Sequence, residues 1–437
     1  MRVRALLGLA VLVTVSSAVA QPTPLRAPAV AKPLTAIRVG DAELARVKAH
    51  SFKPAHVALA LREDTSDGPA IVAARRVPIK VGPTTPKLNV AKFGEAVHAA
   101  FKDNVRGYAL GLRKNGQPVL TLIWDTARSP SQGNKAWSLE TRMHVASVSK
   151  LMTGIIATKM LDERNLSFDT EIGGYLPTYW DEATSSKNLT FRQLLTHKAG
   201  FTIYDGDFAS FKRQIETGVS PNSPSALGYT NGSFSLVRVL AATMTGAVKK
   251  DTRWEAPIPG MDAAQFNDLV WDVKATDAFV AYAQAKVFTP SGVTNVGASP
   301  TATGAIAYAG KTDVTGWDSG DVSTQLGGAG FRLSVNDVLD VMGTFRRKGT
   351  IVSPQKAQEA LDARLGIDRI IDTPAGKLYD KNGAWRDGAS STNHLEQSVA
   401  VFMPEQMECV VLVNSWIGPQ QASLRNAVRD AYLANLE

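Results

Sequence analysis

The chain has 437 residues, of which 44% are hydrophobic and 20% are charged, and its formal net charge is +8. This composition is ordinary for a soluble globular protein and excludes extensive disorder, while the length exceeds one compact core and predicts two lobes or domains. The lysines and arginines form no concentrated run, which argues against a nucleic-acid partner.

The first twenty residues are laid out like a signal peptide. Arg2 and Arg4 precede an apolar stretch over 5–15, and small residues follow at positions 18 and 20. The stretch is shorter than the roughly 20 residues that a helix needs to cross a bilayer. We therefore expect residues 1–20 to be cleaved and the mature protein to be exported, to the periplasm or the medium, without a membrane span.

Residues 21–88 are predicted to form a proline-rich tether followed by a hairpin. Four prolines between positions 22 and 33 disfavour regular structure. Further on, apolar stretches over 55–61 and 70–81 flank a polar turn with Gly68 and Pro69, which is the pattern of a β-hairpin. The sequence assigns this segment no function.

A helix and a second hairpin follow the tether. Asn89 can cap a helix whose apolar residues recur at helical spacing as far as Phe101. The segments 107–112 and 119–124 are predicted strands around the turn Lys114-Asn115-Gly116. A β-sheet therefore begins early in the chain.

The rest of the chain is mostly helical in pattern over 147–345 and returns to strands near its end. Residues 398–402 and 408–414 predict paired strands, and residues 422–436 predict a last helix with one apolar face. Strands at both ends imply one sheet built from both parts of the chain. The expected fold class is mixed α/β (α+β): an antiparallel sheet flanked by helices, with a mostly helical lobe inserted at about 165–325 of a domain spanning 89–437, and a cleft between the two lobes.

Cysteines and histidines indicate neither a disulfide nor a metal site. The single cysteine, Cys409, opens the apolar run 409–413, so no intrachain disulfide can form and a buried structural thiol is expected. The six histidines show neither His-x-His nor His-Glu-x-x-His spacing, so no metal ligands and no cofactor are predicted. A Gly-x-Ser-x-Gly elbow is also absent.

The segment Ser147-Val148-Ser149-Lys150 is the first candidate for chemistry. It opens a predicted helix, and helical positions three apart share a face, so both side chains can point at one spot. A serine hydroxyl is a weak nucleophile until a base takes its proton, and a lysine can serve only if burial or nearby cations lower its pKa. Taken alone, the segment is better explained by a serine cap followed by a surface lysine.

A second candidate is Tyr229-Thr230-Asn231, which stands between Gly228 and Gly232 in a predicted loop. A tyrosine next to lysines can act as a general base, and an asparagine amide can hold a lysine and bind a substrate carbonyl group. By itself the segment could also be a polar turn with a half-buried tyrosine.

The third candidate is Lys381-Asn382-Gly383-Ala384, just before the C-terminal strands. A glycine on an edge strand lets a substrate backbone approach, and the next N–H group can serve an oxyanion hole. The competing interpretation is an ordinary hairpin turn of the Asn-Gly type.

Ser-x-x-Lys, Tyr-x-Asn and Lys-x-Gly in this order resemble the class C β-lactamase and D-alanyl-D-alanine carboxypeptidase family, together with family VIII-type esterases. Residues 143–150 resemble that family's nucleophile segment, and residues 191–200 its "LLTHxSG" segment. Residues 287–293 resemble its "IFxPLGM" segment, and residues 327–337 its "GGxxST..D" segment. The likeness runs from about 89 to 435 and implies a β-lactamase/transpeptidase-like fold.

The resemblance implies a role for each matching residue. Ser147 would be acylated, Lys150 would relay its proton, and Tyr229 would be the general base. The residues that would bind substrate are Asn231, Lys381, Gly383 and Ala384, and the backbone N–H groups of Ser147 and Ala384 would form the oxyanion hole.

The chain departs from this family at Asn382, where β-lactamases carry a threonine or serine that helps hold the substrate carboxylate. The departure favours a carboxylesterase or D-amino-acid peptidase over an efficient β-lactamase. We also expect residues 249–275 to be a long loop, with Trp254 and Trp271, that roofs the cleft. His197 is expected to brace the core or a loop, and His394 to lie at the surface.

The sequence thus predicts a serine hydrolase that acts through an acyl-enzyme on an ester or amide. Its substrate would be a small molecule or a peptide, with peptidoglycan-derived peptides among the candidates. The alternative is a catalytically silent envelope protein that binds cell-wall peptides or penicillins through the same cleft. The complete set of motif residues argues against the alternative.

Overall fold

The computed structural model describes residues 36–37, 39–51, 85–223, 227–254, 260–387, 393–418 and 423–437. Residues 35–437 form one compact unit. The expected signal peptide at 1–20, the tether and the hairpin over 54–81 lie outside the described residues.

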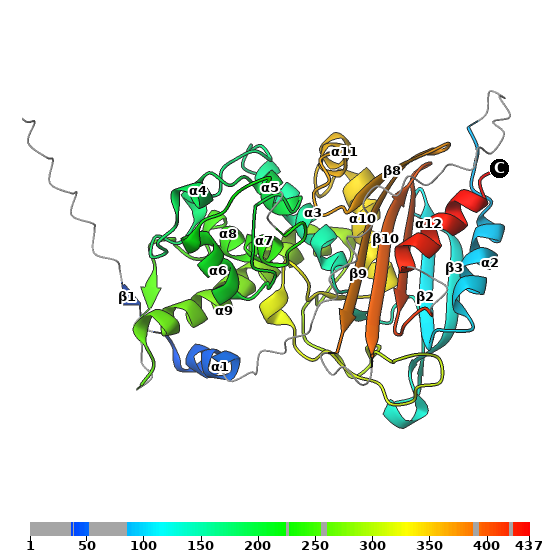
Figure 1. Ribbon diagram of the computed structural model, residues 1–437, viewed down its shortest axis with the longest axis horizontal. Coiled ribbons are helices and arrows are strands. Elements are labelled where there is room, and N and C mark those ends of the chain that lie inside the picture. The colour runs from blue at the N-terminus through cyan, green and yellow to red at the C-terminus, as the bar shows by residue number, and fades with distance from the viewer. Residues whose placement is uncertain are drawn as a thin grey trace, which may run out of the picture. The chain divides into compact units, whose positions relative to one another are not determined.

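A seven-stranded antiparallel sheet, in the order β4-β3-β2-β11-β10-β9-β8, is the centre of the fold (Figure 1). Both predicted strand pairs are present, and the sheet joins the early strands to the late ones because β2 pairs with β11. The strands are β2 Gly107–Lys114, β3 Gln117–Arg128, β4 Lys135–Ala136, β8 Arg369–Thr373, β9 Gly376–Arg386, β10 Leu395–Met403 and β11 Met407–Val413. The predicted mixed α/β class with an antiparallel sheet flanked by helices is confirmed.

One face of the sheet is covered by α2 Val90–Phe101 and α12 Leu424–Ala434, which lie side by side (Figure 1). Successive residues of a strand point to opposite faces, and Cys409 and Val411 accordingly pack with these two helices. Asn89 caps α2 as predicted, since its side chain accepts a hydrogen bond from the Lys92 N–H group. The structural role expected for Cys409 is confirmed, because the thiol is fully buried and burial raises its pKa to about 12.

The opposite face packs on α3 Val148–Asp162 and α10 Val335–Gly343. Val410 and Leu412 point into this second core, together with Leu151 and Ile155 of α3. Helix α3 is buried almost all round, as expected of a helix in the middle of a large core. Its position places its first turn next to the sheet.

In the segment between α3 and α10 the described regular structure is helical apart from two short strands, and its helices gather beside the sheet (Figure 1). Among its helices, α8 packs on α9, and α1 Asp41–Ser51 from the early part of the chain also packs on α9. The helices are α4 Thr184–Lys187, α5 Phe191–Leu195, α6 Phe208–Thr217, α7 Gly232–Ser235, α8 Val237–Met244 and α9 Ala263–Ala283. A further helix, α11 Pro354–Asp362, precedes β8.

The expectation of a long loop over 249–275 is wrong from residue 263 onward, where α9 begins. Trp271 lies within this helix and is fully buried, and its ring meets that of Trp254 edge-on at 5.5 Å. Trp254 belongs to β6 Arg253–Trp254, which pairs in parallel with β1 Ala36–Ile37. The two tryptophans therefore hold the helical segment together.

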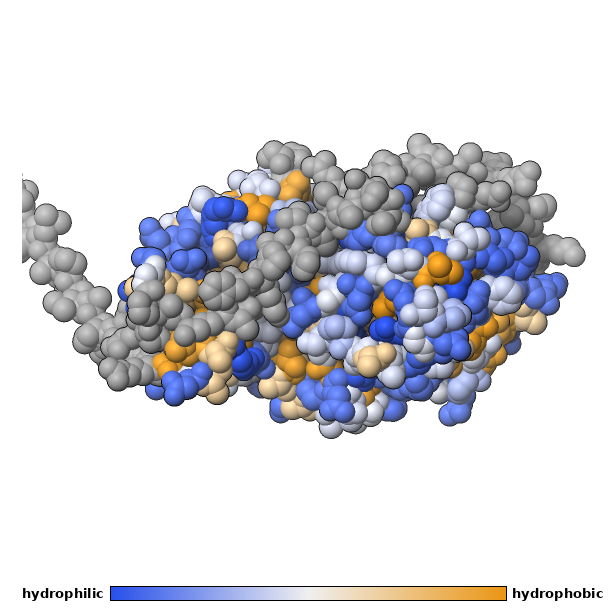
Figure 2. All heavy atoms as spheres, turned by 90° about the horizontal axis from the view of Figure 1, so that it is seen from below, coloured by the Kyte–Doolittle hydropathy of each residue, from blue (hydrophilic) through white to orange (hydrophobic). Residues whose placement is uncertain are grey.

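Hydrophilic residues predominate on the face drawn in Figure 2, with apolar residues interspersed among them. In the part of the chain that the structure describes, no helix combines the length and apolar character needed to traverse a bilayer. The same residues contain no cluster of three or more histidine, cysteine or acidic side chains that could hold a metal ion.

Candidate active site

Ser147 lies where a short strand turns into α3. Strand β5 Met143–His144 pairs with β7 Arg332–Leu333, and the chain then reaches Ala146, whose φ of 46° is left-handed. A left-handed conformation costs an alanine about 1–2 kcal/mol, and such strain is typical of functional sites. Ser147 follows as the residue that precedes the first turn of α3, and only 8% of it is exposed.

The Lys150 ammonium group connects Ser147 to two other segments. Its Nζ lies 3.1 Å from Ser147 Oγ, 2.6 Å from Asn231 Oδ1 and 2.7 Å from the Gly328 carbonyl oxygen. The side chain is fully buried, which excludes the alternative of a surface lysine. Ser147 and Lys150 share a helix face as predicted, and Asn231 joins them from the start of α7.

Tyr229 lies close to two amines. Lys150 Nζ is 4.5 Å and Lys381 Nζ is 5.3 Å from the centre of its ring, and Lys381 Nζ is 3.4 Å from its hydroxyl oxygen. The tyrosine is half-buried, whereas Asn231, two residues later, is almost fully buried. The structure therefore brings Ser147, Lys150, Tyr229, Asn231 and Lys381 together.

His197 packs against the ring of Tyr229. Its ring stacks on the Tyr229 ring at 4.1 Å between centres, and its Nδ1 accepts a hydrogen bond from the Thr230 N–H group. Its backbone is left-handed, with φ at 58°. Burial, followed by the charges of Lys150 and Lys381, holds the pKa of His197 well below 6.5. His197 is thus a neutral residue that braces the site loop.

This neutral histidine predicts a pH-dependent stability. Because its pKa is lower in the folded protein, the unfolded chain binds the proton first, so the stabilisation is complete above about pH 6.5 and falls below it by up to about 1.4 kcal/mol per unit. We expect the stability lost between pH 7 and pH 5, measured by urea unfolding, to be larger in the wild type than in His197→Asn. Asparagine tolerates the left-handed backbone. An equal pH dependence in both proteins would contradict this expectation.

Lys381, on β9, directs its amine at three oxygens. Besides Tyr229, its Nζ lies 2.8 Å from Asp368 Oδ2 and 2.6 Å from the Asn382 carbonyl oxygen. The sequence interpretation missed Asp368. The contact follows from the pairing of β8 with β9, in which Arg369 lies opposite Asp380. Asp368, which precedes Arg369, therefore lies next to Lys381, which follows Asp380.

Gly383 brings β9 against the nucleophile segment. A Cβ atom added to it would lie 2.7 Å from Ser147 N, 2.7 Å from Val145 O and 2.6 Å from Ser398 Oγ. Two of these atoms belong to the backbone and cannot rotate away. A glycine was predicted here so that a substrate backbone could approach, and in the structure the backbone that comes close to Gly383 is that of the nucleophile segment.

We expect Gly383→Ala to lower kcat by about 100-fold, because the clash separates Ser147 N from β9 and disturbs the predicted oxyanion hole. Overpacking of this kind also lowers stability by about 1–3 kcal/mol. Steady-state ester hydrolysis and urea unfolding measure the two effects. Gly174→Ala is the matched control, since Gly174 is exposed and its added Cβ would meet nothing within 4 Å. Equal rates in both variants would contradict the expectation.

Two other histidines differ from the sequence interpretation. His394 was expected at the surface, which is wrong: it is 7% exposed, and its ring nitrogens lie 2.6 Å from Asp387 Oδ2 and 2.9 Å from the Thr315 carbonyl oxygen. His144, to which the sequence gave no role, is fully buried, with Nδ1 2.9 Å from Glu396 Oε2. Spacing along the chain carries no signal for either partner.

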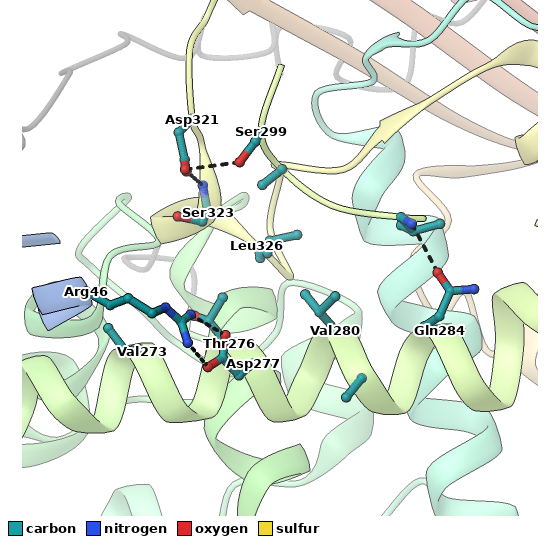
Figure 3. Close-up of a pocket in the computed structure, with 13 residues that line it drawn as sticks. Arg46, Val273, Thr276, Asp277, Val280, Gln284, Ser299, Asp321, Ser323 and Leu326 are labelled. Carbon is teal, nitrogen blue, oxygen red and sulfur yellow. Dashed lines mark hydrogen bonds and ion pairs between the residues drawn. The ribbon is translucent and has the colours of Figure 1, made fainter. Parts of the chain in front are cut away.

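A cavity of about 480 Å³ lies elsewhere, along α9 (Figure 3). Arg46 of α1 reaches across to Asp277 with two hydrogen bonds of 2.8 and 2.7 Å. None of the predicted site residues lines this cavity.

Comparison with known proteins gives one family and a set of similar folds. The model of the family described as Beta-lactamase matches residues 90–431. A β-lactamase/D-alanine carboxypeptidase from Pseudomonas syringae is 17% identical with a TM-score of 0.56, over 79% of this chain and 96% of that one. A penicillin-binding protein from Bacillus halodurans is 18% identical with a TM-score of 0.54, over 80% and 99%. An octameric penicillin-binding protein homologue from Pyrococcus abyssi is 15% identical with a TM-score of 0.55, over 76% and 75%.

Proposed function

The chain belongs to the beta-lactamase family, and on this premise we propose that it is a serine hydrolase whose Ser147 is acylated by an ester or amide substrate. The observation that carries the proposal is the 3.1 Å contact between Ser147 Oγ and the buried Nζ of Lys150 at the start of α3. A hydroxyl group needs a proton-transfer partner within hydrogen-bond reach to become a nucleophile, and this contact places the Lys150 amine at that distance.

The proton would leave Ser147 along the amines and the phenol. The Lys150 ammonium group takes up the Ser147 proton as it gives one of its own protons to the Tyr229 phenolate, which acts as the general base and later returns that proton to the leaving group. The two amines around the Tyr229 ring support this role, because positive charge nearby stabilises a phenolate. Asn231 Oδ1 and the Gly328 carbonyl oxygen hold Lys150 in place through both steps.

The oxyanion of the tetrahedral intermediate would be bound by the N–H groups of Ser147 and Ala384. Ser147 stands at the N-terminus of α3, where backbone N–H groups lack helical partners and the helix dipole favours negative charge. The Asn382 N–H group donates to Asp368, on the side of β9 that faces away from β10. Every second N–H group of a strand points to the same side. The Ala384 N–H group therefore points to that edge, close to Ser147.

For the substrate we propose a carboxylesterase or D-amino-acid peptidase activity rather than efficient β-lactam hydrolysis. The support is Asn382, an amide where β-lactamases carry a hydroxyl group; its Oδ1 lies 3.4 Å from Arg425 of α12. Peptidoglycan-derived peptides are candidate substrates, and export to the periplasm or the medium is part of the same proposal.

Covalent trapping tests this function. The wild type is incubated with a fluorescent fluorophosphonate, the adduct is mapped by mass spectrometry, and nitrocefin is compared with p-nitrophenyl esters as substrate. We expect an adduct on Ser147 and faster ester than nitrocefin turnover. Rapid nitrocefin hydrolysis would overturn the esterase assignment. The absence of both labelling and turnover would favour the silent cell-wall-binding protein.

A further inference from the structure

Asp368 is an acidic side chain at the edge of the proposed site. It immediately precedes β8, and its carboxylate accepts hydrogen bonds from Lys381 Nζ at 2.8 Å and from the Asn382 N–H group at 3.3 Å. Arg425 NH1 lies 3.7 Å from the same oxygen. The Asp368 side chain is only 10% exposed. A buried carboxylate is thus placed among two cations and a strand N–H group.

The place that Asp368 occupies is where a substrate could extend the sheet. Among the described strands, β8 accompanies β9 only as far as Asp380. Beyond that point the Asn382 N–H group points away from β10, and it donates its hydrogen bond to the Asp368 carboxylate instead of to another strand. An extended ligand that adds to an open sheet edge bonds to such N–H groups.

The Lys381 amine is already committed to protein oxygens. An ammonium group has three N–H donors, and Lys381 Nζ has three oxygens within 3.4 Å, those of Tyr229, Asp368 and Asn382. Its side chain is fully buried. A substrate carboxylate could reach this cation only by displacing Asp368, and it would be repelled by the aspartate charge.

Resting on the proposed serine hydrolase function, we propose that Asp368 is a specificity residue that stands in for a substrate carboxylate and restricts the enzyme to substrates that are uncharged next to the scissile bond. Lys381 then acts on Tyr229 and not on an anionic substrate. Neutral esters and amides are accepted, and acyl donors with a carboxylate in the leaving group, including peptides that would release a C-terminal D-amino acid, are rejected.

The test compares two esters that differ only in charge, 3-carboxyphenyl acetate and 3-carbamoylphenyl acetate. We expect the wild type to prefer the neutral carbamoyl ester at least about tenfold in kcat/KM, and Asp368→Asn to shift the ratio towards the carboxylate ester on the order of 10- to 100-fold. Asp372→Asn is the matched control, because Asp372 is an exposed acid on β8, the strand that follows Asp368, and we expect it to leave the ratio unchanged. Thermal unfolding checks that each variant is folded.

The outcomes separate this inference from the function beneath it. A wild type that prefers the carboxylate ester overturns the role of Asp368, whether or not the variant folds. So does a folded Asp368→Asn protein with an unchanged ratio while fluorophosphonate still labels Ser147. A wild type that neither hydrolyses the esters nor is labelled overturns both the inference and the serine hydrolase function.

Discussion

Ser147→Ala is expected to lower kcat for ester hydrolysis by about 10⁴-fold or more and to abolish labelling by fluorophosphonates. The substitution removes the one oxygen that the proposed mechanism acylates, and loss of a nucleophile that acts in concert with its base removes nearly all catalysis. Lys150 keeps its contacts with Asn231 and Gly328, so the fold should persist. Stopped assays at high enzyme concentration, with circular dichroism, measure both properties.

The control for this variant is Ser149→Ala. Ser149 belongs to the same helix and is also buried, but its Oγ accepts a hydrogen bond from the Phe331 N–H group at 3.1 Å. Its loss leaves that buried donor without its partner and lowers stability by about 1–3 kcal/mol, while kcat should stay within about tenfold. Full activity in Ser147→Ala would place the nucleophile elsewhere.

Lys150→Met is expected to lower kcat by about 10³-fold, within the range that general-base catalysis contributes. Methionine fills a similar volume but takes no proton, and it leaves Asn231 Oδ1 and the Gly328 carbonyl oxygen without their shared donor. Some loss of stability is therefore expected, at about 1–3 kcal/mol per unsatisfied group. Single-turnover kinetics with a p-nitrophenyl ester separate acylation from hydrolysis of the acyl-enzyme.

Two further variants make this prediction specific. Lys150→Arg retains a positive charge but cannot give up its proton, so it should be as inactive as Lys150→Met if Lys150 relays protons. Lys159→Met removes an ammonium group from the same helix, 3.5 Å from Glu163, and should change kcat little. Substantial activity in Lys150→Arg would assign Lys150 a purely electrostatic role.

The local parts of the fold could be predicted because they follow from short-range periodicity. The i, i+3 spacing placed Ser147 and Lys150 together, and short apolar runs indicated β10 and β11. Helix α9 was missed because it is buried on several sides, and even Asp272 lies inside, paired with Arg238 at 2.7 Å. Without a polar face it shows no single apolar stripe. Its one clear signal was Asp262, which caps the first turn.

Of the site residues, only those in the three sequence motifs could be predicted. Asp368, Gly328 and His144 lie outside the motif positions that were assigned roles, and their contacts depend on how distant segments meet. The left-handed Ala146 gave no signal either, since alanine rarely adopts this conformation. Residue type and spacing identify candidate groups, whereas burial and pairing decide which oxygens each amine reaches.

Because β2 pairs with β11, the central sheet can form only late in the synthesis of the chain. Tyr108 lies opposite Val413, so the inner edge of β2 has no neighbour until roughly 300 more residues have left the ribosome. At about 5–20 residues per second this takes on the order of tens of seconds. A nascent chain therefore carries an open, apolar strand edge that invites aggregation, and a chaperone that shields residues 107–114 during this interval should raise the yield of folded protein.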